Sequence, residues 1–332
     1  MRKLAIAFSA ALGSALFLAV LLFAGFDSII EPFRNFSPFY LLLFLLMSLV
    51  LYITTTWRWA TVIKYQGLKA PFITLLKYKV IGSAVSYLTP AVRIGGEPLR
   101  GFLFKRRFGL KGSEAYSSVF LEMSIGVAID TIFFCSVLLA FLVFFTLPSE
   151  LEAYSVIFSM IALSLVAAFY ISLATHRGPL SLPFRVLSFL IKTDFLKRLV
   201  KRIVSVEDDM VEFLHFRKKG VAQTILISMI GPPVTFFQYK FALLSIGVDV
   251  PFEIILLSIS ATAIAGVVPI PGAFGIQELG NFSVFSIIGM PGIGFALSLI
   301  IRFKDIISSF IGLTLLSYEG MGMLKILKSK KR

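Results

Sequence analysis

The sequence contains very few of the residues that support redox or metal chemistry. Its 332 residues include one cysteine, Cys135, and two histidines, His176 and His215. A single cysteine excludes a disulfide within the chain, and two separated histidines do not have the spacing of a metal site. Neither a nucleotide-binding motif such as GxxxxGK[ST] nor a Ser-His-Asp arrangement is evident. We therefore expect no metal, no cofactor and no enzymatic activity.

Charged residues are also scarce, and long apolar runs take their place. Charged residues make up 15% of the chain and hydrophobic residues 58%, which is far from the composition of a soluble domain. The mainly apolar, uncharged runs are Leu4–Phe26, Asn35–Trp57, Ala153–Thr175, Val221–Tyr239 and Ile254–Gln277. Because a helix that crosses a bilayer needs roughly 20 such residues, the sequence predicts a multi-pass protein of the cell membrane.

The first apolar run follows Arg2 and Lys3, as the core of a signal peptide would. It is longer than the roughly 7–15 apolar residues of such a core. We therefore expect it to be a retained membrane helix.

Basic residues outnumber acidic ones by 32 to 18, which gives a net charge of +14. In a soluble protein this excess would suggest nucleic acid, but here the placement of the charge is more informative than its sum. The basic blocks occupy residues 2–3, 58–79, 100–111, 177–219 and 325–332, whereas segments 25–38, 146–154, 247–253 and 279–292 contain one basic residue, Arg34. By the positive-inside rule we expect both termini in the cytoplasm and no nucleic-acid partner.

The charge pattern also predicts which apolar segments cross the membrane. Phe72–Leu88 has basic blocks at both ends, so it cannot cross and remain consistent with the rule. We predict an all-α polytopic membrane protein with six full transmembrane helices and two re-entrant helical hairpins, Phe72–Phe104 and Phe252–Ile288. The six spans are residues 4–26 and about 39–57, 115–145, 153–175, 221–245 and 293–318. The alternative is that each hairpin consists of ordinary spanning helices.

An internal repeat relates the two halves of the chain. Matching residues lie 180 positions apart, as in Gly67 and Gly247 (247 − 67 = 180), and the other pairs are Pro71-Phe72 with Pro251-Phe252, Gly109 with Gly289 and Gly112 with Gly292. We expect inverted-topology repeats, about 39–145 and about 219–318, within one membrane domain of residues 1–332, because an odd number of crossings separates them. Chance similarity between two Gly- and Pro-rich segments is the alternative.

The tips of the two hairpins correspond when one residue is deleted. The residues that set their backbone geometry are Pro90, Gly95, Gly96, Pro269, Pro271, Gly272 and Gly275. Non-helical backbone at membrane depth is tolerated only where protein or a watery cavity satisfies it. Interrupted helices in inverted repeats are typical of transporters with a site near the membrane midplane. We therefore expect the two tips to meet and line a polar cavity.

Charged residues within these segments are candidate substrate-binding residues, either at the lipid phosphate or in the cavity around it, because each costs roughly 2.5–3.5 kcal/mol at the centre of a helix. The candidates are Arg93, Glu97, Arg100, Glu122, Glu278 and Arg302. The guanidinium of Arg93 offers a fork of donors suited to phosphate, and the alternative is an ion pair with Glu97. Arg100 either holds a second oxygen or reaches the membrane surface with the basic residues that follow it.

For the remaining candidates, ion pairs and caps are the competing interpretations. Glu278 either caps the start of a broken helix or gates the cavity. The repeat places Glu122 opposite Arg302, so these two are a possible pair, with Asp305 as the local competitor for Arg302. Lys304 and Asp305 form a second possible pair.

Residues 176–220 form the largest segment predicted outside the membrane. Apolar residues between Leu187 and Ile203 recur at helical spacing with basic residues between them. This pattern is typical of an amphipathic helix on anionic lipid, and packing against the protein itself is the alternative. A connector of this length is too short for a separate catalytic domain.

The two tip motifs resemble those of a known family. The pattern Pro90-x-x-Arg93-x-Gly95-Gly96-Glu97-x-x-Arg100 and the pattern Pro269-x-Pro271-Gly272-x-x-Gly275-x-x-Glu278, with Arg302 after them, resemble the membrane region of lysylphosphatidylglycerol synthase. The resemblance extends over about Met1 to Leu324. It implies a membrane protein that moves a phospholipid or a polyprenyl-phosphate-type lipid between leaflets, without the soluble domain that makes the aminoacyl lipid in the synthase.

One segment departs from the family. There the acid on the third helix is usually followed by arginine, with aspartate a turn later, whereas this chain has Glu122-Met123, Gly126 and then Asp130. The family's roles therefore do not transfer directly to this helix.

Together these observations predict a flippase-like lipid translocase whose partners are membrane lipids with anionic head groups. One alternative is a membrane-embedded head-group transferase with Glu97, Glu122 or Glu278 as general base. The other is an ion-coupled transporter of a small solute, which the same repeats would suit.

Overall fold

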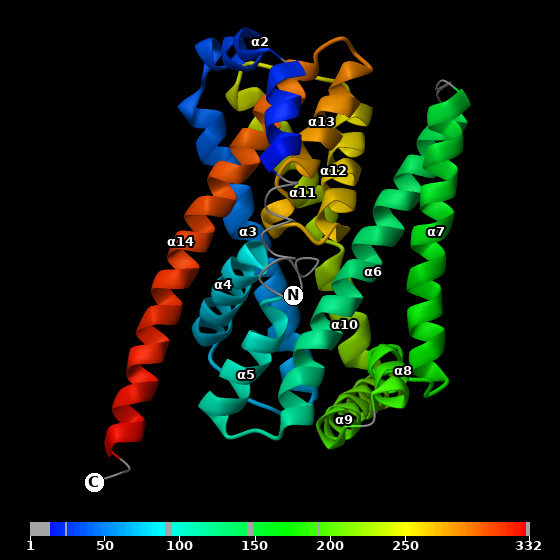
Figure 1. Cartoon of the computed structure of the whole chain (residues 1–332), viewed down its shortest axis with the longest axis vertical. Coiled ribbons are helices and arrows are strands. Elements are labelled where there is room, and N and C mark those ends of the chain that lie inside the picture. The colour runs from blue at the N-terminus through cyan, green and yellow to red at the C-terminus, as the bar shows by residue number, and fades with distance from the viewer. Residues whose placement is uncertain (1–13, 24, 90–94, 145–148, 192, 330–332) are drawn as a thin grey trace. The chain divides into compact units, whose positions relative to one another are not determined.

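The computed structural model describes residues 14–23, 25–89, 95–144, 149–191 and 193–329 (Figure 1). These residues form α-helices and two short 3-10 helices, with no β-strand in the part of the chain that is described. The predicted all-α fold is confirmed.

A helical segment at residues 14–23 precedes the numbered elements. The elements in chain order are α2 (Phe26–Ile30), η1 (Glu31–Asn35), α3 (Pro38–Tyr65), α4 (Phe72–Leu88), α5 (Glu97–Phe108), α6 (Gly112–Phe144), α7 (Ser149–Ala174), α8 (Leu182–Leu190), α9 (Asp194–Phe216), α10 (Lys218–Ser228), α11 (Gly231–Ser245), α12 (Phe252–Val267), η2 (Pro271–Ala273), α13 (Ile276–Ser286) and α14 (Pro291–Ser329).

Four helical stretches of the described chain are long and apolar enough to cross a membrane. They are Pro38–Tyr65, Gly112–Ala140, Ser155–Ala174 and Lys218–Ser245, and a fifth is formed if Ser14–Phe23 and Asp27–Asn35, which meet at 92°, count as one span. The four helices of the expected hairpins are shorter. α4 has 17 residues, α5 has 12, α12 has 16 and α13 has 11, each below the roughly 20 residues that a crossing requires.

Several helix boundaries differ from the sequence prediction. α3 continues past Trp57 to Tyr65, so Arg58 lies inside a helix and not in a basic loop. The predicted single helix Val221–Ser245 consists of α10 and α11, with a break at Met229 and Ile230. Gly231-Pro232-Pro233 follows this break, and proline at the first turn of a helix is favourable because its missing N–H is not needed there.

The predicted repeat coincides with a repeat in secondary structure. α3 and α10 begin 180 residues apart (218 − 38), as do the starts of α4 and α12 (252 − 72), and α3 and α11 end 180 residues apart (245 − 65). The loop glycines also correspond. Gly67 and Gly247 have φ of 79° and 72°, and Gly109 and Gly289 have φ of 66° and 71°, the left-handed conformation that glycine supplies after a helix.

The chain forms two compact units. The helices α3, α4, α5 and α11 each have residues in both of them. Unit 1 contains Met1–Tyr52, Leu76–Arg100 and Val234–Arg332, and unit 2 contains Ile53–Leu75 and Gly101–Pro233. In unit 1, α13 packs against both α12 and α14, and α2 packs on α14. A small apolar core there consists of Val20, Ile29 and Phe295.

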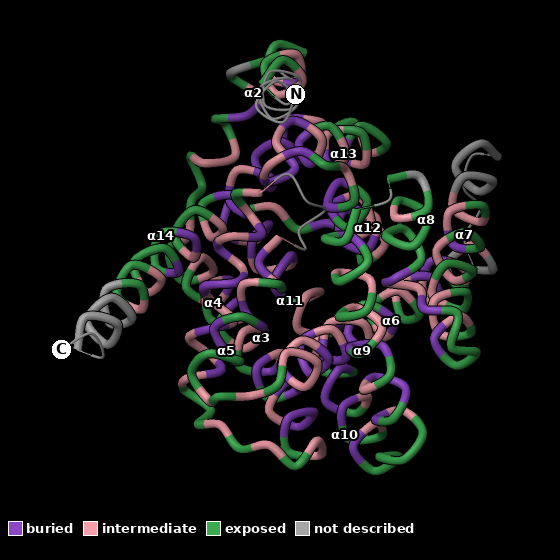
Figure 2. The backbone as a smooth tube through the Cα atoms, turned by 60° about the horizontal axis from the view of Figure 1, so that its bottom comes forward, coloured by how far each residue is buried: buried purple, intermediate pink, exposed green. Residues whose placement is uncertain are grey.

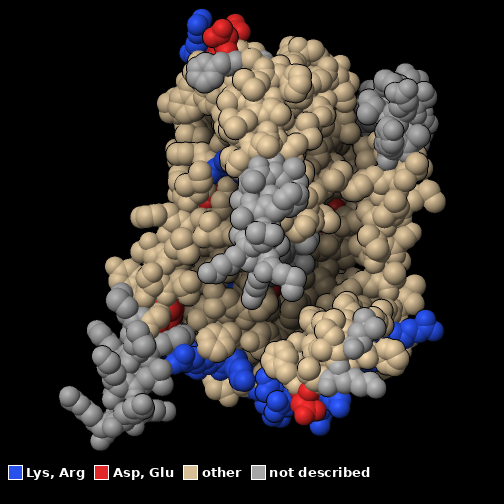
Figure 3. Space-filling model, viewed as in Figure 1, with Lys and Arg blue, Asp and Glu red and all other residues tan. Residues whose placement is uncertain are grey.

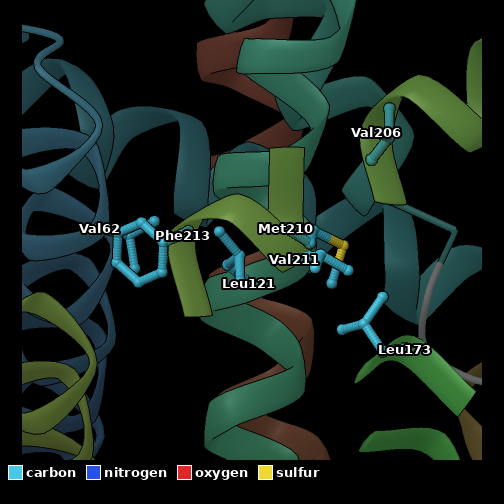
Figure 4. Close-up of a cluster of buried hydrophobic side chains, with 7 residues drawn as sticks. All are labelled: Val62, Leu121, Leu173, Val206, Met210, Val211 and Phe213. Carbon is cyan, nitrogen blue, oxygen red and sulfur yellow. The ribbon is translucent and has the colours of Figure 1, made fainter. Parts of the chain in front are cut away.

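In unit 2, α6 packs against α7, α9 and α10, and α8 lies on α9. α6 and α7 run side by side in opposite directions (Figure 1). The core of the unit gathers side chains from α3, α6, α7 and α9, namely Val62, Leu121, Leu173, Val206, Met210, Val211 and Phe213 (Figure 4). Both the start of α6 and the end of α3 are therefore fixed by burial against α9.

The amphipathic segment has two different parts. α9 buries apolar residues such as Met210 and Phe213, so the prediction that this segment packs against its own protein is confirmed for α9. α8, in contrast, is exposed along nearly its whole length (Figure 2). The apolar residues Leu182, Phe184, Val186, Leu187 and Phe189 all lie on its surface. Contact of this surface with lipid stays a prediction.

The charges of α9 are ordered along the helix. Lys197, Arg198, Lys201 and Arg202 occupy the first half, and Glu207, Asp208, Asp209 and Glu212 occupy the second. Burial raises the pKa of Asp209, and the nearby carboxylates of Glu212, Glu114 and Asp208 act in the same direction, while a hydrogen bond with Ser113 opposes them. Positive charge at the start of a helix and negative charge at its end both oppose the helix dipole. The local fold therefore does not explain this order.

Candidate functional site

Three buried arginines each pair with a glutamate. The pairs are Arg58 with Glu122, Arg100 with Glu97, and Arg302 with Glu278. All three arginines are buried, and so are Glu122 and Glu278. Because an isolated buried charge is costly, each arginine is stabilised by the counter-charge of its glutamate.

Arg302, on α14, lies at the centre of a network in unit 1. Its Nε and Nη2 donate to the two carboxylate oxygens of Glu278, with 2.7 Å between Nη2 and Oε2. Nη1 donates to the carbonyl of Gly272 at 3.2 Å, and Nη2 donates to the carbonyl of Ala273 at 3.3 Å. The guanidinium carbon lies 4.7 Å from the centre of the Phe274 ring, a cation–π distance. The donors of Arg302 are thus used by the protein itself.

Those carbonyls belong to η2, the short and irregular 3-10 turn in the loop between α12 and α13. Gly272 has φ of 60° and Ala273 has φ of 51°, which is uncommon for a residue with a side chain. The loop contains Pro269 and Pro271, which were predicted to interrupt this segment. Buried backbone carbonyls that are not bonded within a helix need another donor. Arg302 is that donor, because a guanidinium has enough N–H groups to serve a carboxylate and two carbonyls together.

Glu278 has two roles at the start of α13. Its Oε2 accepts a hydrogen bond of 2.8 Å from the backbone N–H of Gly275, so the prediction that it caps this helix is confirmed. The same carboxylate pairs with Arg302. A carboxylate in the first turn is favoured by the unpaired N–H groups and by the helix dipole. Glu278 therefore fixes the loop to α13 and α14 at once.

The first hairpin is closed by a contact between glycines. Pro90 and Arg93 lie outside the described residues, but Gly95 and Gly96 are described. A Cβ at Gly96 would overlap the backbone of Gly82 on α4, and the Gly96 N–H donates to Ser86 Oγ at 2.9 Å. The start of α5 therefore packs directly on α4.

Arg100 lies across the same contact and does not reach the membrane surface. Its Nη1 donates to Glu97 Oε2 at 2.5 Å, and its aliphatic part lies over Gly82. The side chain is buried, whereas Lys105, Arg106 and Arg107, further along α5, are exposed. Of the two alternatives for Arg100, contact with the surface is wrong, because the side chain is buried and pairs with a carboxylate one turn away.

Within unit 1, the end of α4 contacts the segment between α12 and α13, whereas the tip residues 90–94 lie outside the described residues. Tyr87, in the last turn of α4, has its hydroxyl 3.3 Å from Arg302 Nη1. A Cβ at Gly272 would lie 3.0 Å from the Tyr87 ring. The end of α4 therefore touches the loop of the second hairpin.

Arg58 is the residue that the sequence analysis missed. On α3, its Nε donates to Glu122 Oε1 on α6 at 2.9 Å, and Nη2 donates to the same oxygen. The guanidinium lies flat on Gly126, where a Cβ would overlap it. The charge pattern assigned Arg58 to a basic loop, although helix-forming residues continue without a break until Gly67. That continuity was the signal for a longer helix.

The ion pairs differ from the pairing that the repeat suggested. Glu122 pairs with Arg58 and Arg302 pairs with Glu278, so the suggested Glu122–Arg302 pair is not the arrangement in the structure. Asp305 pairs with Lys304 at 2.8 Å, as the sequence suggested, and Arg302 uses Glu278. Symmetry-related positions need not touch unless they lie near the symmetry axis, which is why the repeat alone gave the wrong partners.

Further polar contacts fix α3 against α6 around the Arg58 pair. Trp59 Nε1 donates to Ser118 Oγ at 3.1 Å, and Gln66 Nε2 donates to Ser117 Oγ at 3.0 Å. Hydrogen bonds between polar side chains are a common means of setting the register of membrane helices. They hold Arg58 at the level of Glu122 and Gly126.

The comparisons with known proteins agree with this architecture. The family model of the lysylphosphatidylglycerol synthase TM region matches residues 5–312. A UPF0104 membrane protein of Pyrococcus horikoshii is 25% identical over 337 residues, which cover 96% of this chain and 96% of the relative. A UPF0104 membrane protein of Methanocaldococcus jannaschii is 24% identical over 327 residues, which cover 95% of this chain and 94% of the relative. The chain therefore belongs to the lysylphosphatidylglycerol synthase TM region family of multi-pass integral membrane proteins.

Proposed function

We propose that the protein is a lipid translocase that moves an anionic phospholipid or a polyprenyl-phosphate-type lipid between the leaflets of the cell membrane. The observation that carries the proposal is the interrupted segment α12–α13, whose loop is held by the buried Arg302–Glu278 pair. Interrupted membrane helices of this kind are typical of transporters, where the irregular backbone lies beside the substrate path. Membership of a flippase-like family supports the same function.

The recurrence of helix boundaries at a separation of 180 residues supports a duplication. We infer that the two halves are inverted-topology repeats, with α4–α5 and α12–α13 as re-entrant hairpins and both termini in the cytoplasm. The short lengths of these four helices favour re-entry over crossing. Transport would then follow from rocking of one repeat against the other.

The roles proposed from the sequence change for Arg93, Arg100 and Arg302. Glu97 is paired with Arg100, so the proposal assigns Arg93 to the lipid phosphate and not to Glu97. Arg100 and Arg302 are assigned to positioning, because their donors serve Glu97, Glu278 and the loop. A guanidinium at a hairpin tip lowers the cost of bringing a phosphate to membrane depth while the acyl chains stay in lipid.

The test uses purified protein in vesicles with a fluorescent anionic lipid in one leaflet. Movement of intact lipid to the other leaflet supports a translocase, and Arg93→Lys should slow it because lysine lacks the bidentate fork. Arg106→Lys, an exposed change in the neighbouring helix α5, is the matched control and should leave the rate unchanged. A new lipid species in the vesicles would indicate a head-group transferase, and neither result would favour a small-solute transporter.

A further inference from the structure

Asp130 is a carboxylate on the surface of a membrane-spanning helix. It lies on α6 within the stretch Gly112–Ala140, and it is exposed on the surface of that helix. The exposed residues around it on α6 are apolar, including Val127, Ile132 and Phe133. Glu122, two turns earlier, is fully buried. The two acids of this helix therefore have very different surroundings.

Both acids flank the same guanidinium. Glu122, Gly126 and Asp130 are spaced by four residues and share one face of α6. Each acid is about 6 Å along the helix axis from Gly126, on which the Arg58 guanidinium lies. Side chains of a helix lean toward its N-terminus, so the Asp130 carboxylate leans toward Gly126 and Arg58. Arg58 is hydrogen-bonded to Glu122 and acts on Asp130 through its charge alone.

The other groups near Asp130 do not neutralise it. A Cβ at Gly231, at the break between α10 and α11, would lie 3.5 Å from Asp130 Oδ1, and this segment contributes no titratable group. From α7, Tyr170 interacts with Ser124 and with the charge of Arg58. The charged groups that face Asp130 in the described chain are thus Arg58 and Glu122, and Asp130 has no ion pair of its own there.

The charges at this place do not balance. Arg58 and Glu122 neutralise each other, so an ionised Asp130 adds one uncompensated negative charge to an apolar helix surface, which is unfavourable within a span. One guanidinium cannot satisfy two carboxylates fully, and the buried Glu122 would be the more expensive one to leave without it. A proton on Asp130 removes the imbalance without moving Arg58.

We propose that Asp130 is a proton-binding site within the membrane, coupled to Glu122 through Arg58. A proton taken from water onto the Asp130 carboxylate leaves Arg58 with Glu122 and keeps α3 joined to α6. Release of that proton gives Arg58 a second carboxylate and weakens the bond between the two helices. This inference rests on the proposed function in one respect only: if the protein moves lipid, the movement is proton-dependent.

The first experiment measures thermal unfolding of the purified protein in detergent between about pH 5 and pH 8. A group that binds its proton more tightly in the folded state stabilises that state as the pH falls. Wild type is therefore expected to gain on the order of 2 °C per pH unit over Asp130→Asn as the pH falls through the titration of Asp130. All other titratable groups are the same in both proteins, so their contributions cancel in this difference.

Asp305→Asn is the matched control, because it makes the same change at an aspartate that is paired with Lys304. It should retain the wild-type response to acid. Asp130→Glu keeps a carboxylate and should retain the response as well, which provides a readout if Asp130→Asn does not fold. If the unfolding temperatures of wild type and Asp130→Asn change in parallel with pH, the proton site is overturned. The same holds for any other folded variant that lacks the carboxylate. Stabilisation of wild type, but not of Asp130→Asn, by sodium, potassium or ammonium at fixed pH would overturn it in favour of a cation site.

The second experiment compares lipid movement in vesicles at the two ends of the same pH range. Wild type is expected to change its rate severalfold, and Asp130→Asn to move lipid at a rate independent of pH. A wild-type protein that moves no lipid would contradict the proposed function and leave the result from thermal unfolding intact. A variant that keeps the wild-type pH dependence would contradict the coupling alone.

Discussion

The two buried ion pairs Arg302–Glu278 and Arg58–Glu122 have the same chemistry but different surroundings. Arg302 has a bidentate carboxylate, two loop carbonyls, a tyrosine hydroxyl and an aromatic ring around it. Arg58 lies on the backbone of Gly126 and donates to one oxygen of Glu122. It also interacts electrostatically with a second acid, Asp130. The surroundings of Arg302 provide hydrogen-bond partners for only one position of its guanidinium. The surroundings of Arg58 offer it two acids, Glu122 and Asp130. This arrangement suits a group that changes its partner during a transport cycle.

The comparison predicts the largest effect for removal of Arg302. Arg302→Ala would leave the buried Glu278 carboxylate and the carbonyls of Gly272 and Ala273 without their donor. Loss of one partner from a buried pair costs about 3–5 kcal/mol, and we expect a loss near the upper end of this range. Thermal unfolding in detergent and the monodispersity of the purified protein measure it. Arg106→Ala removes an exposed arginine and should have little effect, and equal losses in the two variants would contradict the network.

Removal of Arg58 should be less damaging and more easily repaired. Arg58→Met alone leaves Glu122 buried without a counter-charge, and Glu122→Gln alone leaves Arg58 with Asp130 as its remaining acid. We expect Arg58→Met to cost about 3 kcal/mol, Glu122→Gln less, and the double variant less than the sum of the two. Unfolding of the four proteins of this cycle gives the coupling directly. Additive losses would mean that the two side chains do not support each other.

A change at Gly126 sharpens the comparison without altering any charge. In Gly126→Ala the new methyl group would overlap the Arg58 guanidinium, which must then leave its place. We expect a loss of about 1–3 kcal/mol, as for other crowded sites. Gly320→Ala, on α14, is the control because a Cβ there meets nothing within 4 Å. This change should be neutral or slightly stabilising, since alanine favours a helix. If Gly126→Ala does not destabilise the protein, the contact between Arg58 and Gly126 does not restrict the guanidinium.

The smallest effect on the protein alone is expected at the surface of α9. Arg198, Lys201, Arg202 and Ser205 line a hollow of about 310 Å³ there, and basic side chains gather at the lower edge of the view in Figure 3. Basic residues near an anionic bilayer contribute about 1 kcal/mol each. Changing the three basic residues to glutamine should leave stability in neutral detergent unchanged and abolish the stabilisation that added phosphatidylglycerol gives to wild type.

The control for this change removes the same charge elsewhere in the segment. Arg217, Lys218 and Lys219 are exposed at the junction of α9 and α10. Their replacement by glutamine should keep most of the response to phosphatidylglycerol. An equal loss in both triple variants would indicate a general effect of net charge and no preference for α9.

The sequence predicted the elements and their interruptions better than their contacts. Pro269, Pro271 and Gly272 predict the break between α12 and α13, because proline lacks an N–H and glycine permits a positive φ. The cap by Glu278 follows from its position in the first turn after Gly275. These features depend on neighbouring residues, so they are visible in the sequence.

The partners of the charged residues depend on tertiary structure and were not visible. Arg58 was counted with the cytoplasmic lysines because a rule based on composition does not distinguish a buried arginine from an exposed one. Its partner, Glu122, lies 64 residues away on another helix. Arg302 was matched to Glu122 by the internal repeat, which gives equivalent positions and not contacts.

The separation of Arg302 from its partner has a consequence for how the chain enters the membrane during synthesis. Glu278 and Arg302 are 24 residues apart on consecutive helices, α13 and α14. If α13 and α14 enter the membrane together, Glu278 and Arg302 can already be paired. The insertion machinery then transfers a neutral pair and not two separate charges. Arg58 has no such neighbour, because Glu122 follows only 64 residues later in the chain. The N-terminal half of the chain must therefore keep its arginine at the aqueous side until α6 arrives, whereas the C-terminal half carries its own counter-charge from the start.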